Sequence, residues 1–373
     1  MGQRVMDLTG RAEGLALRVD AAPAHEFLVS LCAFALPHEH ATMESGPGWF
    51  ENIRTRASRE LAHALDSIGP NSGKAWVNFL GLAVAPPAVR RVPDLLARIG
   101  ALSPLDVRLY LMGYHVPAYQ ATISREVLRR AAEGDRDAVG ILVHDRAYYG
   151  GEAGQLLGPL LTLSPDRTKD LTMEVLGRWY REVFRRDEEQ LVAVLDRDAE
   201  AKRALVGTVT PEELIETASG IQYVPRPDIR QVFLIPQVAM RPWVLLCEHD
   251  DTRLFCYPVA DESLGTDPDA PPARMVRIHR ALGDEKRIRM LKAIATSAST
   301  LQELADLFDV PKSSLHHHLA ILRAAGLVRV TSDLERRYSV RYDVIPEASG
   351  LLDAYLRPGR GGPSVSPAAE GRR

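Results

Sequence analysis

Three consecutive histidines stand out among the side chains of this sequence that could do chemistry. They occupy positions 316–318, inside a run that extends from Lys312 to Ala325. Imidazole groups bind metal ions and also donate and accept hydrogen bonds. Successive residues of a helix point about 100° apart, so neighbouring imidazoles cannot share one ion as an i, i+4 pair can. The run therefore predicts hydrogen bonding to another molecule rather than a metal site.

The run from Lys312 to Ala325 has the period of a helix with two unlike faces. Leu315, Leu319 and Leu322 recur at i, i+4 and i+7, and such a stripe packs against a neighbouring helix. The opposite face carries small and hydrogen-bonding side chains, namely Ser313, His316, His317 and Ala320. The major groove of DNA accepts such a face. We predict that this helix contacts DNA through Lys312, Ser313, Ser314, His316, His317 and Arg323.

The residues in front of this helix predict its partner in a helix-turn-helix. Apolar residues between 278 and 294 have the spacing of two helical pieces, which Gly283-Asp284 separates. Thr300-Leu301-Gln302-Glu303 is a capping box that opens a short helix, in which we expect Leu301, Leu304 and Leu307 to be buried. Asp309-Val310-Pro311 then makes the turn. The N–H groups that begin the next helix can meet a phosphate.

The residues after the histidine helix predict a two-stranded wing. Leu327–Val330 forms the first strand, Thr331–Glu335 turns the chain, and Arg337–Asp343 returns with alternating apolar and polar residues. Arg336 and Arg337 are expected at the tip of the wing. There they could reach backbone phosphates or an adjacent minor groove.

Together these segments resemble the winged helix of the ArsR family of bacterial regulators. The resemblance rests on ALGDEKRIRMLKAIA, TLQELADLFDVPKSSLHHHLAILRAAGLVRV and RRYSV. It implies a homodimer that binds a palindromic operator in double-stranded DNA and represses until an effector binds, with base contacts at Lys312, Ser313, His316 and His317. His317 stands where an arginine often reads guanine. Leu304–Phe308 lacks the Cys-x-Cys motif of the family's thiolate metal sensors.

Composition divides the chain into four parts and predicts a mainly α fold. We expect a mostly helical effector or dimerisation domain at 1–260 that ends in a small antiparallel β element, a linker at 261–273, the winged helix-turn-helix at 274–357 and a disordered tail at 358–373. Between Arg274 and Tyr342 there are 13 Lys or Arg and 7 Asp or Glu, whereas the whole chain has a net charge of −3. A basic module on an acidic body suits nucleic-acid binding.

Within residues 1–260, helical patterns give way to strand patterns near the end. Helices are expected at Trp49–Ile68, from Ser164 and from Thr210. Short apolar runs predict strands at Ile229–Pro236, Pro242–Glu248 and Arg253–Tyr257, with a further strand at Leu15–Val19.

Several classes of protein are disfavoured. The sequence shows neither an apolar run long enough to span a membrane nor a secretory signal. Cys32, Cys247 and Cys256 are unlike a secreted disulfide framework, so we expect a cytoplasmic location and no membrane contact. His38 and His40 near Cys32 indicate a turn rather than a metal site. A redox switch between Cys247 and Cys256 stays open as an alternative.

These patterns lead to one principal hypothesis and two alternatives. We predict a sequence-specific transcriptional regulator, controlled through its N-terminal domain by an unidentified small-molecule effector, with no catalytic residues, cofactor or metal. In the first alternative, residues 1–260 are an enzyme or a small-molecule-binding domain fused to a winged-helix module. In the second, the winged helix docks a protein instead of DNA.

Overall fold

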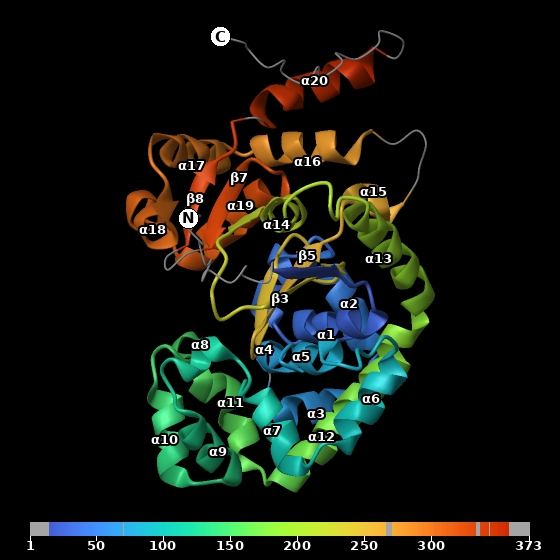
Figure 1. The fold of residues 1–373 in the computed structure, drawn as a ribbon, viewed down its shortest axis with the longest axis vertical. Coiled ribbons are helices and arrows are strands. Elements are labelled where there is room, and N and C mark those ends of the chain that lie inside the picture. The colour runs from blue at the N-terminus through green and yellow to red at the C-terminus, as the bar shows by residue number, and fades with distance from the viewer. Residues whose placement is uncertain (1–14, 70, 266–270, 333–335, 343, 358–373) are drawn as a thin grey trace, which may run out of the picture. The chain divides into compact units, whose positions relative to one another are not determined.

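The computed structural model describes residues 15–69, 71–265, 271–332, 336–342 and 344–357. It is mainly α-helical, as the sequence predicts (Figure 1). The chain divides into two compact units, Met1–Leu264 and Gly265–Arg373. Each unit is described by itself below. The tail expected at 358–373 lies outside the described residues.

The first unit is built on a four-stranded mixed sheet in the order β1-β3-β5-β4. The strands are β1 (Ala16–Val19), β3 (Gln231–Gln237), β4 (Leu245–His249) and β5 (Thr252–Pro258). Strand β3 runs parallel to both β1 and β5, and only β4 is antiparallel to its neighbour. The predicted antiparallel element is present only as the β4–β5 hairpin, and the sheet as a whole is mixed. The chain reverses direction between β3 and β4 and again between β4 and β5, so β3 and β5 run the same way, and they are neighbours because β5 lies between β3 and β4.

Helices cover this sheet, and its central strands are buried. All residues of β3 from Val232 to Gln237 are buried, as is β5 from Thr252 to Tyr257. Strands buried on both faces carry continuous apolar runs, which explains their sequences. Helices α1 (Pro23–Phe34) and α13 (Glu188–Arg203) pack against β3, and α14 (Pro211–Ser219) packs against β5.

The remaining helices of the first unit follow one another along the chain with short connections. Helix α12 (Pro165–Arg178) packs against α3, α6 and α7. The others are α2 (Gly46–Arg56), α3 (Arg59–Ile68), α4 (Gly73–Trp76), α5 (Phe79–Val84), α6 (Val92–Ala101), α7 (Pro104–Leu111), α8 (Pro117–Gln120), α9 (Arg125–Glu133), α10 (Arg136–His144) and α11 (Ala153–Thr162), with a short strand β2 (Ile221–Tyr223) after α14.

Two expectations about this unit need correction. The single helix expected at Trp49–Ile68 is broken into α2 and α3, because Ser58 caps α3 by accepting a hydrogen bond from the N–H of Leu61. The linker expected at 261–273 begins later than predicted. Residues 261–264 form α15 (Asp261–Leu264), because the carboxylate of Asp198 accepts hydrogen bonds from the backbone N–H of Ala260 and the hydroxyl of Ser263.

The second unit has five helices and three strands among its described residues. They are α16 (Ala273–Leu282), α17 (Glu285–Thr296), β6 (Ser299–Thr300), α18 (Leu301–Phe308), α19 (Lys312–Ala324), β7 (Val328–Ser332), β8 (Arg337–Val340) and α20 (Val344–Leu356). Strand β8 pairs antiparallel with both β6 and β7. One apolar cluster joins every helix of the unit to the β7–β8 hairpin.

Within the part of the chain that the structure describes, no helix is both long and apolar enough to cross a lipid bilayer.

Candidate nucleic-acid interface

Helices α18 and α19 form the pair that the sequence predicts. The capping box at the start of α18 is present: the Thr300 hydroxyl accepts from the N–H of Glu303 at 3.1 Å, and the Glu303 carboxylate accepts from the N–H of Thr300 at 2.8 Å. Asp309 ends α18 with a left-handed φ of +50°, a conformation that Asp tolerates better than most residues. Pro311 then directs the chain into α19.

The leucine face of α19 attaches this helix to the rest of the unit. Leu315, Leu319 and Leu322 have at most 1% of their surface exposed and belong to the apolar cluster of the unit. From α18, Leu304 and Ala305 join the same cluster. Leu307, which we expected to be buried, is 65% exposed, because the helix turns it away from the cluster. The half-buried Phe308 packs against the cluster instead.

The other side of α19 carries most of the predicted contact residues. Lys312 and Ser314 are exposed, and His316 and His317 are half-buried. Ser313 lies in the first turn of the helix, but its side chain is outside the described part. Ala320 does not fit the expectation, since only 4% of its surface is exposed. A methyl group extends only a short way from the helix axis, so it reaches solvent less than a longer side chain on the same face does.

The first turn of α19 differs from those of the two helices before it. Asp284 caps α17 through the N–H of Arg287, and Thr300 caps α18. Pro311 precedes α19, and no described side chain caps this helix. The N–H groups of Lys312 and Ser313 have no partner within the helix because of their position. The N-terminus of α19 is therefore suited to accept an anion.

His316 lies in a basic environment. Burial, together with the nearby cations of Arg323 and Arg336, lowers the pKa of His316 to about 4. His316 is therefore a neutral imidazole at neutral pH, with one ring nitrogen that donates and one that accepts. Burial also lowers the pKa of the half-buried Arg323 to about 10, so this guanidinium keeps its charge.

The two arginines predicted at the wing tip have different surroundings. Arg336 directly precedes β8 and is exposed. Arg337 is the first residue of β8, and its guanidinium turns back toward the start of α18. There it donates to the carbonyl of Ala298 at 3.1 Å and lies 3.6 Å from the carboxylate of Glu303. A phosphate would have to compete with these contacts for Arg337, which makes Arg336 the better candidate.

Sequence reasoning missed helix α20 and its surface. Val344 and Ala348 of α20 are buried in the apolar cluster, and α20 packs against α16. Ile345 and Leu356 leave 45% and 66% of their surfaces exposed. The apolar spacing between positions 344 and 356 was the signal for this helix, although the Pro at 346 obscured it.

The cysteine pair considered as a redox switch lies in the first unit. In the β4–β5 pairing Cys247 is opposite Leu254 and Cys256 is opposite Leu245, so the two cysteines are diagonal neighbours. Both are free thiols. A hydrogen bond with Cys247, together with burial, raises the pKa of Cys256 well above its ordinary value. Because the thiolate is the reactive form, this environment disfavours oxidation of Cys256.

Comparison with known proteins agrees with the helix pair. Residues 282–331 match the family model of the helix-turn-helix domain. The C-terminal unit contains a helix-turn-helix. Over 66 residues the chain is 36% identical to the HTH-type transcriptional regulator KmtR of Mycobacterium tuberculosis (strain ATCC 25618 / H37Rv), a stretch that covers 18% of this chain and 51% of that protein. The chain thus spans about half the length of this curated relative. No solved structure matches the chain.

Proposed function

We propose that this protein is a sequence-specific DNA-binding transcriptional regulator whose helix α19 enters the major groove. One observation carries the proposal. Helix α19 buries a leucine face in its own unit while Lys312, Ser314, His316 and His317 stay outside the apolar cluster, within a stretch that matches the helix-turn-helix domain. A recognition helix needs this division between a packed face and a polar face.

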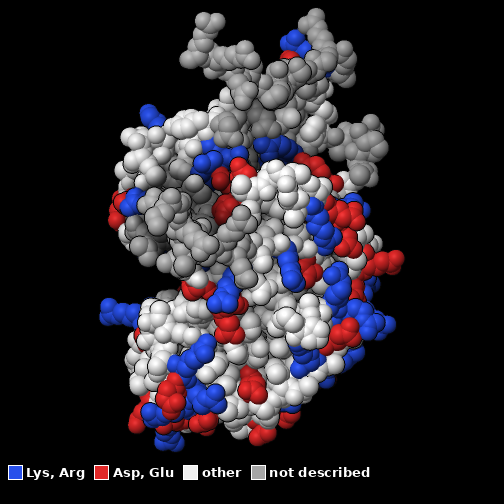
Figure 2. Space-filling view, viewed as in Figure 1, with Lys and Arg blue, Asp and Glu red and all other residues white. Residues whose placement is uncertain are grey.

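Phosphate contacts would position the unit on the duplex. Lys312 and the N-terminal N–H groups of α19 offer one such contact, and Arg336 before β8 offers another. The charges support this role, because the second unit is rich in Lys and Arg. On the face of the first unit seen in Figure 2, basic and acidic side chains are intermixed. Attraction to phosphate is therefore expected from the second unit.

Base contacts would come from the two histidines near the middle of the exposed side of α19. A neutral His316 can donate to or accept from a base edge without the salt dependence of a cation. His317 follows it in the sequence, and the ring centroids of His317 and His318 are 5.8 Å apart. His318 is half-buried near Asp284, which makes it a packing residue in this proposal.

Helices α16 and α20 support a homodimer on a palindromic operator. Val276 of α16 and Ile345, Tyr355 and Leu356 of α20 leave between 42% and 66% of their surfaces exposed. Exposed apolar side chains on two packed helices are typical of a protein–protein interface. Two-fold symmetry would place the two α19 helices in half-sites roughly 34–36 Å apart, or at a multiple of that distance.

In more detail, we propose that the protein is an ArsR-like repressor whose DNA binding is controlled by the first unit. In it, Met1–Leu264 binds an effector or contributes to dimerisation and has no catalytic role. The match of 282–331 to the helix-turn-helix domain, next to a larger unit, supports this arrangement, because a ligand that binds the larger unit can change the affinity of the smaller one for DNA. Turnover of a substrate by the isolated full chain would contradict the absence of catalysis.

Selection of bound duplexes from a random pool tests the proposal. The expected result is an enriched palindrome, and enrichment of no sequence would contradict a sequence-specific regulator. Anisotropy titrations with that duplex then separate the roles. His317→Ala should cost about 1–3 kcal/mol at one base position, while Arg336→Ala should weaken all duplexes alike and reduce the salt slope by about 1.

Matched controls are available in the same unit. His279→Ala replaces an exposed histidine of α16 whose Nδ1 contacts the Met275 carbonyl, and Arg289→Ala replaces an exposed arginine of α17 that pairs with Glu285. Neither residue is among the proposed DNA contacts, so both variants should keep the base discrimination and the salt dependence of the wild type. Equal losses from the controls and the interface variants would overturn the assignment of roles.

A further inference from the structure

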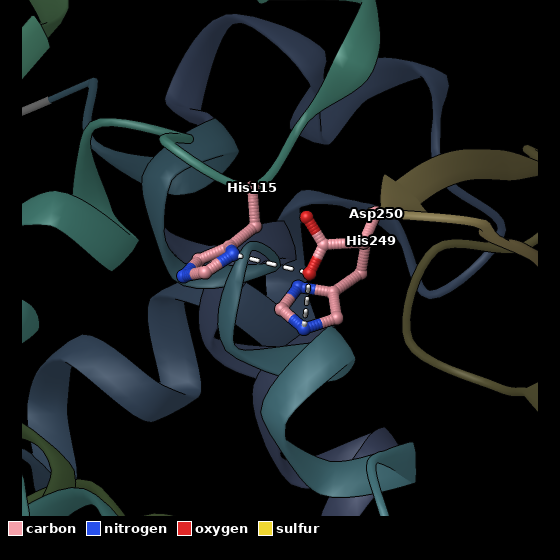
Figure 3. Close-up of side chains that lie close together, drawn as sticks. All are labelled: His115, His249 and Asp250. Carbon is pink, nitrogen blue, oxygen red and sulfur yellow. Dashed lines mark hydrogen bonds and ion pairs between the residues drawn. The ribbon is translucent and has the colours of Figure 1, made fainter. Parts of the chain in front are cut away.

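Two histidines and an aspartate meet in the first unit, where His115 lies beside the consecutive residues His249 and Asp250 although it is far from them in the sequence. His115 lies in the loop between α7 and α8, His249 is the last residue of β4, and Asp250 opens the turn between β4 and β5 (Figure 3). We call them the His-His-Asp cluster. None of the three residues belongs to the helix-turn-helix.

The distances in the cluster suit a metal ion. Oδ2 of Asp250 lies 3.3 Å from Nδ1 of His115 and 3.7 Å from Nε2 of His249. One ligand atom from each residue lies within 4.8 Å of the other two. Ligands bonded at roughly 2.0–2.1 Å to a tetrahedral ion are about 3.4 Å apart. The three side chains could therefore bind one ion after small movements, each only a fraction of the present distances between their ligand atoms.

The backbone fixes two of the ligands to each other. The N–H of Asp250 donates to the carbonyl of His115 at 2.8 Å, which joins the β4–β5 turn to the loop after α7. Asp250 has a left-handed φ of +49°. This conformation directs the turn, and Asp and Asn adopt it more readily than most residues. The link brings the ligands together without requiring an ion to hold them.

Packing positions the third ligand. His249 stacks on Tyr110 with an interplanar angle of 13° and lies directly against Gly81 of α5. A Cβ at position 81 would overlap the His249 ring, so glycine is required for this placement. Only 13% of the His249 side chain is exposed. A ligand whose rotamer is restricted by packing loses little freedom when it binds an ion.

A neighbouring arginine occupies one oxygen of the Asp250 carboxylate and leaves the other available to an ion. Arg125 lies 3.2 Å from Oδ1 of Asp250, which leaves Oδ2 facing the histidines. Outer partners of this kind orient metal-binding carboxylates.

We propose that His115, His249 and Asp250 bind one divalent first-row transition-metal ion, of which zinc is the representative. Two imidazoles and one carboxylate form a donor set that such ions prefer, with further coordination positions left for water or a small ligand. The site lies wholly in the first unit. It does not depend on the proposed DNA binding, and either can fail without the other.

Zinc binding by the metal-free full chain tests the proposal. Equilibrium dialysis should give one tightly bound Zn²⁺ per wild-type chain. Asp250→Asn keeps the size and suits the left-handed backbone, and His115→Gln alters a residue that is 29% exposed. Each should weaken the affinity by roughly 100-fold or more, because even outer partners of metal ligands contribute 10–100-fold. His63→Ala, at an exposed site on α3, and His317→Ala should retain the wild-type affinity.

A paired glycine test examines the positioning of His249. Gly81→Ala should displace the ring and weaken zinc binding, whereas Gly140→Ala, in α10 with nothing within 4 Å of the added Cβ, should not. Co²⁺ titrations give an independent readout through the ligand-field absorption of the bound ion, which should appear with the wild type and be lost in Asp250→Asn. Thermal unfolding of the metal-free variants checks that each one is folded.

The proposal is overturned if Asp250→Asn and His115→Gln, both folded, bind zinc as tightly as the wild type does. It is equally overturned if the wild type binds no zinc at a stoichiometry near one. Loss of binding in His317→Ala alone would move the site to α19 and contradict the assignment.

Discussion

The two units hold their candidate sites in opposite ways. In the second unit, the residues proposed to meet DNA lie on one helix and the hairpin that follows it, and their neighbours in sequence position them. In the first unit, His115 and Asp250 are 135 positions apart, and a sheet turn and an interhelical loop bring them together. A local site can be inferred from periodicity alone. A site made by tertiary contacts becomes visible only when the fold is known.

Because the proposed DNA interface and the His-His-Asp cluster lie in different units, we expect that a substitution can abolish one kind of binding and leave the other. Leu319→Ala removes a side chain that is 1% exposed and should destabilise the second unit by about 2–5 kcal/mol, because it leaves a cavity. DNA binding should fall with the stability of that unit, while zinc binding persists. Chemical denaturation and dialysis on the same sample measure both quantities.

Leu307→Ala is the matched control, since Leu307 is 65% exposed on α18. It should change the free energy of unfolding by less than about 0.5 kcal/mol. If Leu319→Ala abolished zinc binding as well, the two sites would not be separable and the comparison would fail.

A buried carboxyl group should make the stability of the first unit fall as the pH rises. Burial raises the pKa of Glu26 in α1 to about 8, although the backbone N–H groups of Ala239 and Val238 act in the opposite direction. A raised pKa means that the stabilisation is complete below the ordinary value of 4.5 and is lost as the pH rises through about 8.

Glu26→Gln removes this proton and keeps a hydrogen-bond acceptor. Between pH 5 and pH 8, the free energy of unfolding of the wild type should fall relative to that of the variant by on the order of 3 kcal/mol. Urea denaturation at several pH values measures the difference. Curves that stay parallel over this interval would rule out Glu26 as the titrating group.

The smallest expected effect concerns the capping box of α18. Thr300→Ala removes the acceptor for the N–H of Glu303 and should cost about 1 kcal/mol of stability in the second unit. Thr296→Ala, at an exposed position near the end of α17, should be close to neutral. A loss for Thr300→Ala no greater than that for Thr296→Ala would mean that the cap does not stabilise this unit.

The same difference between local and long-range contacts decides which features could be predicted from the sequence. The capping box at Thr300 and the leucine face of α19 depend on neighbours within one or two helical turns, and both were found. The pairing of Ala16 with Gln231 joins the two ends of the first unit, and its direction could not be inferred from either strand. The direction of the Arg337 side chain toward Glu303 likewise depends on the pairing of β6 with β8.

The His-His-Asp cluster shows the same limit for a functional site. His249 and Asp250 fall between the predicted strands Pro242–Glu248 and Arg253–Tyr257, and nothing in the sequence near them indicates that His115 is the third ligand. The role of Gly81, which leaves room for the His249 ring, has no sequence signal without the contact itself. Residue type alone identified the three histidines of α19 as candidates, but their surroundings separate His316 from His318.

The central claim is that α19 reads DNA. Its most direct test compares the wild type and His317→Ala for binding to the selected duplex and to duplexes substituted at each base pair. The account predicts that the variant loses discrimination at one position of each half-site and keeps it at the others. Equal loss at every position, or no selective binding by the wild type, would contradict it.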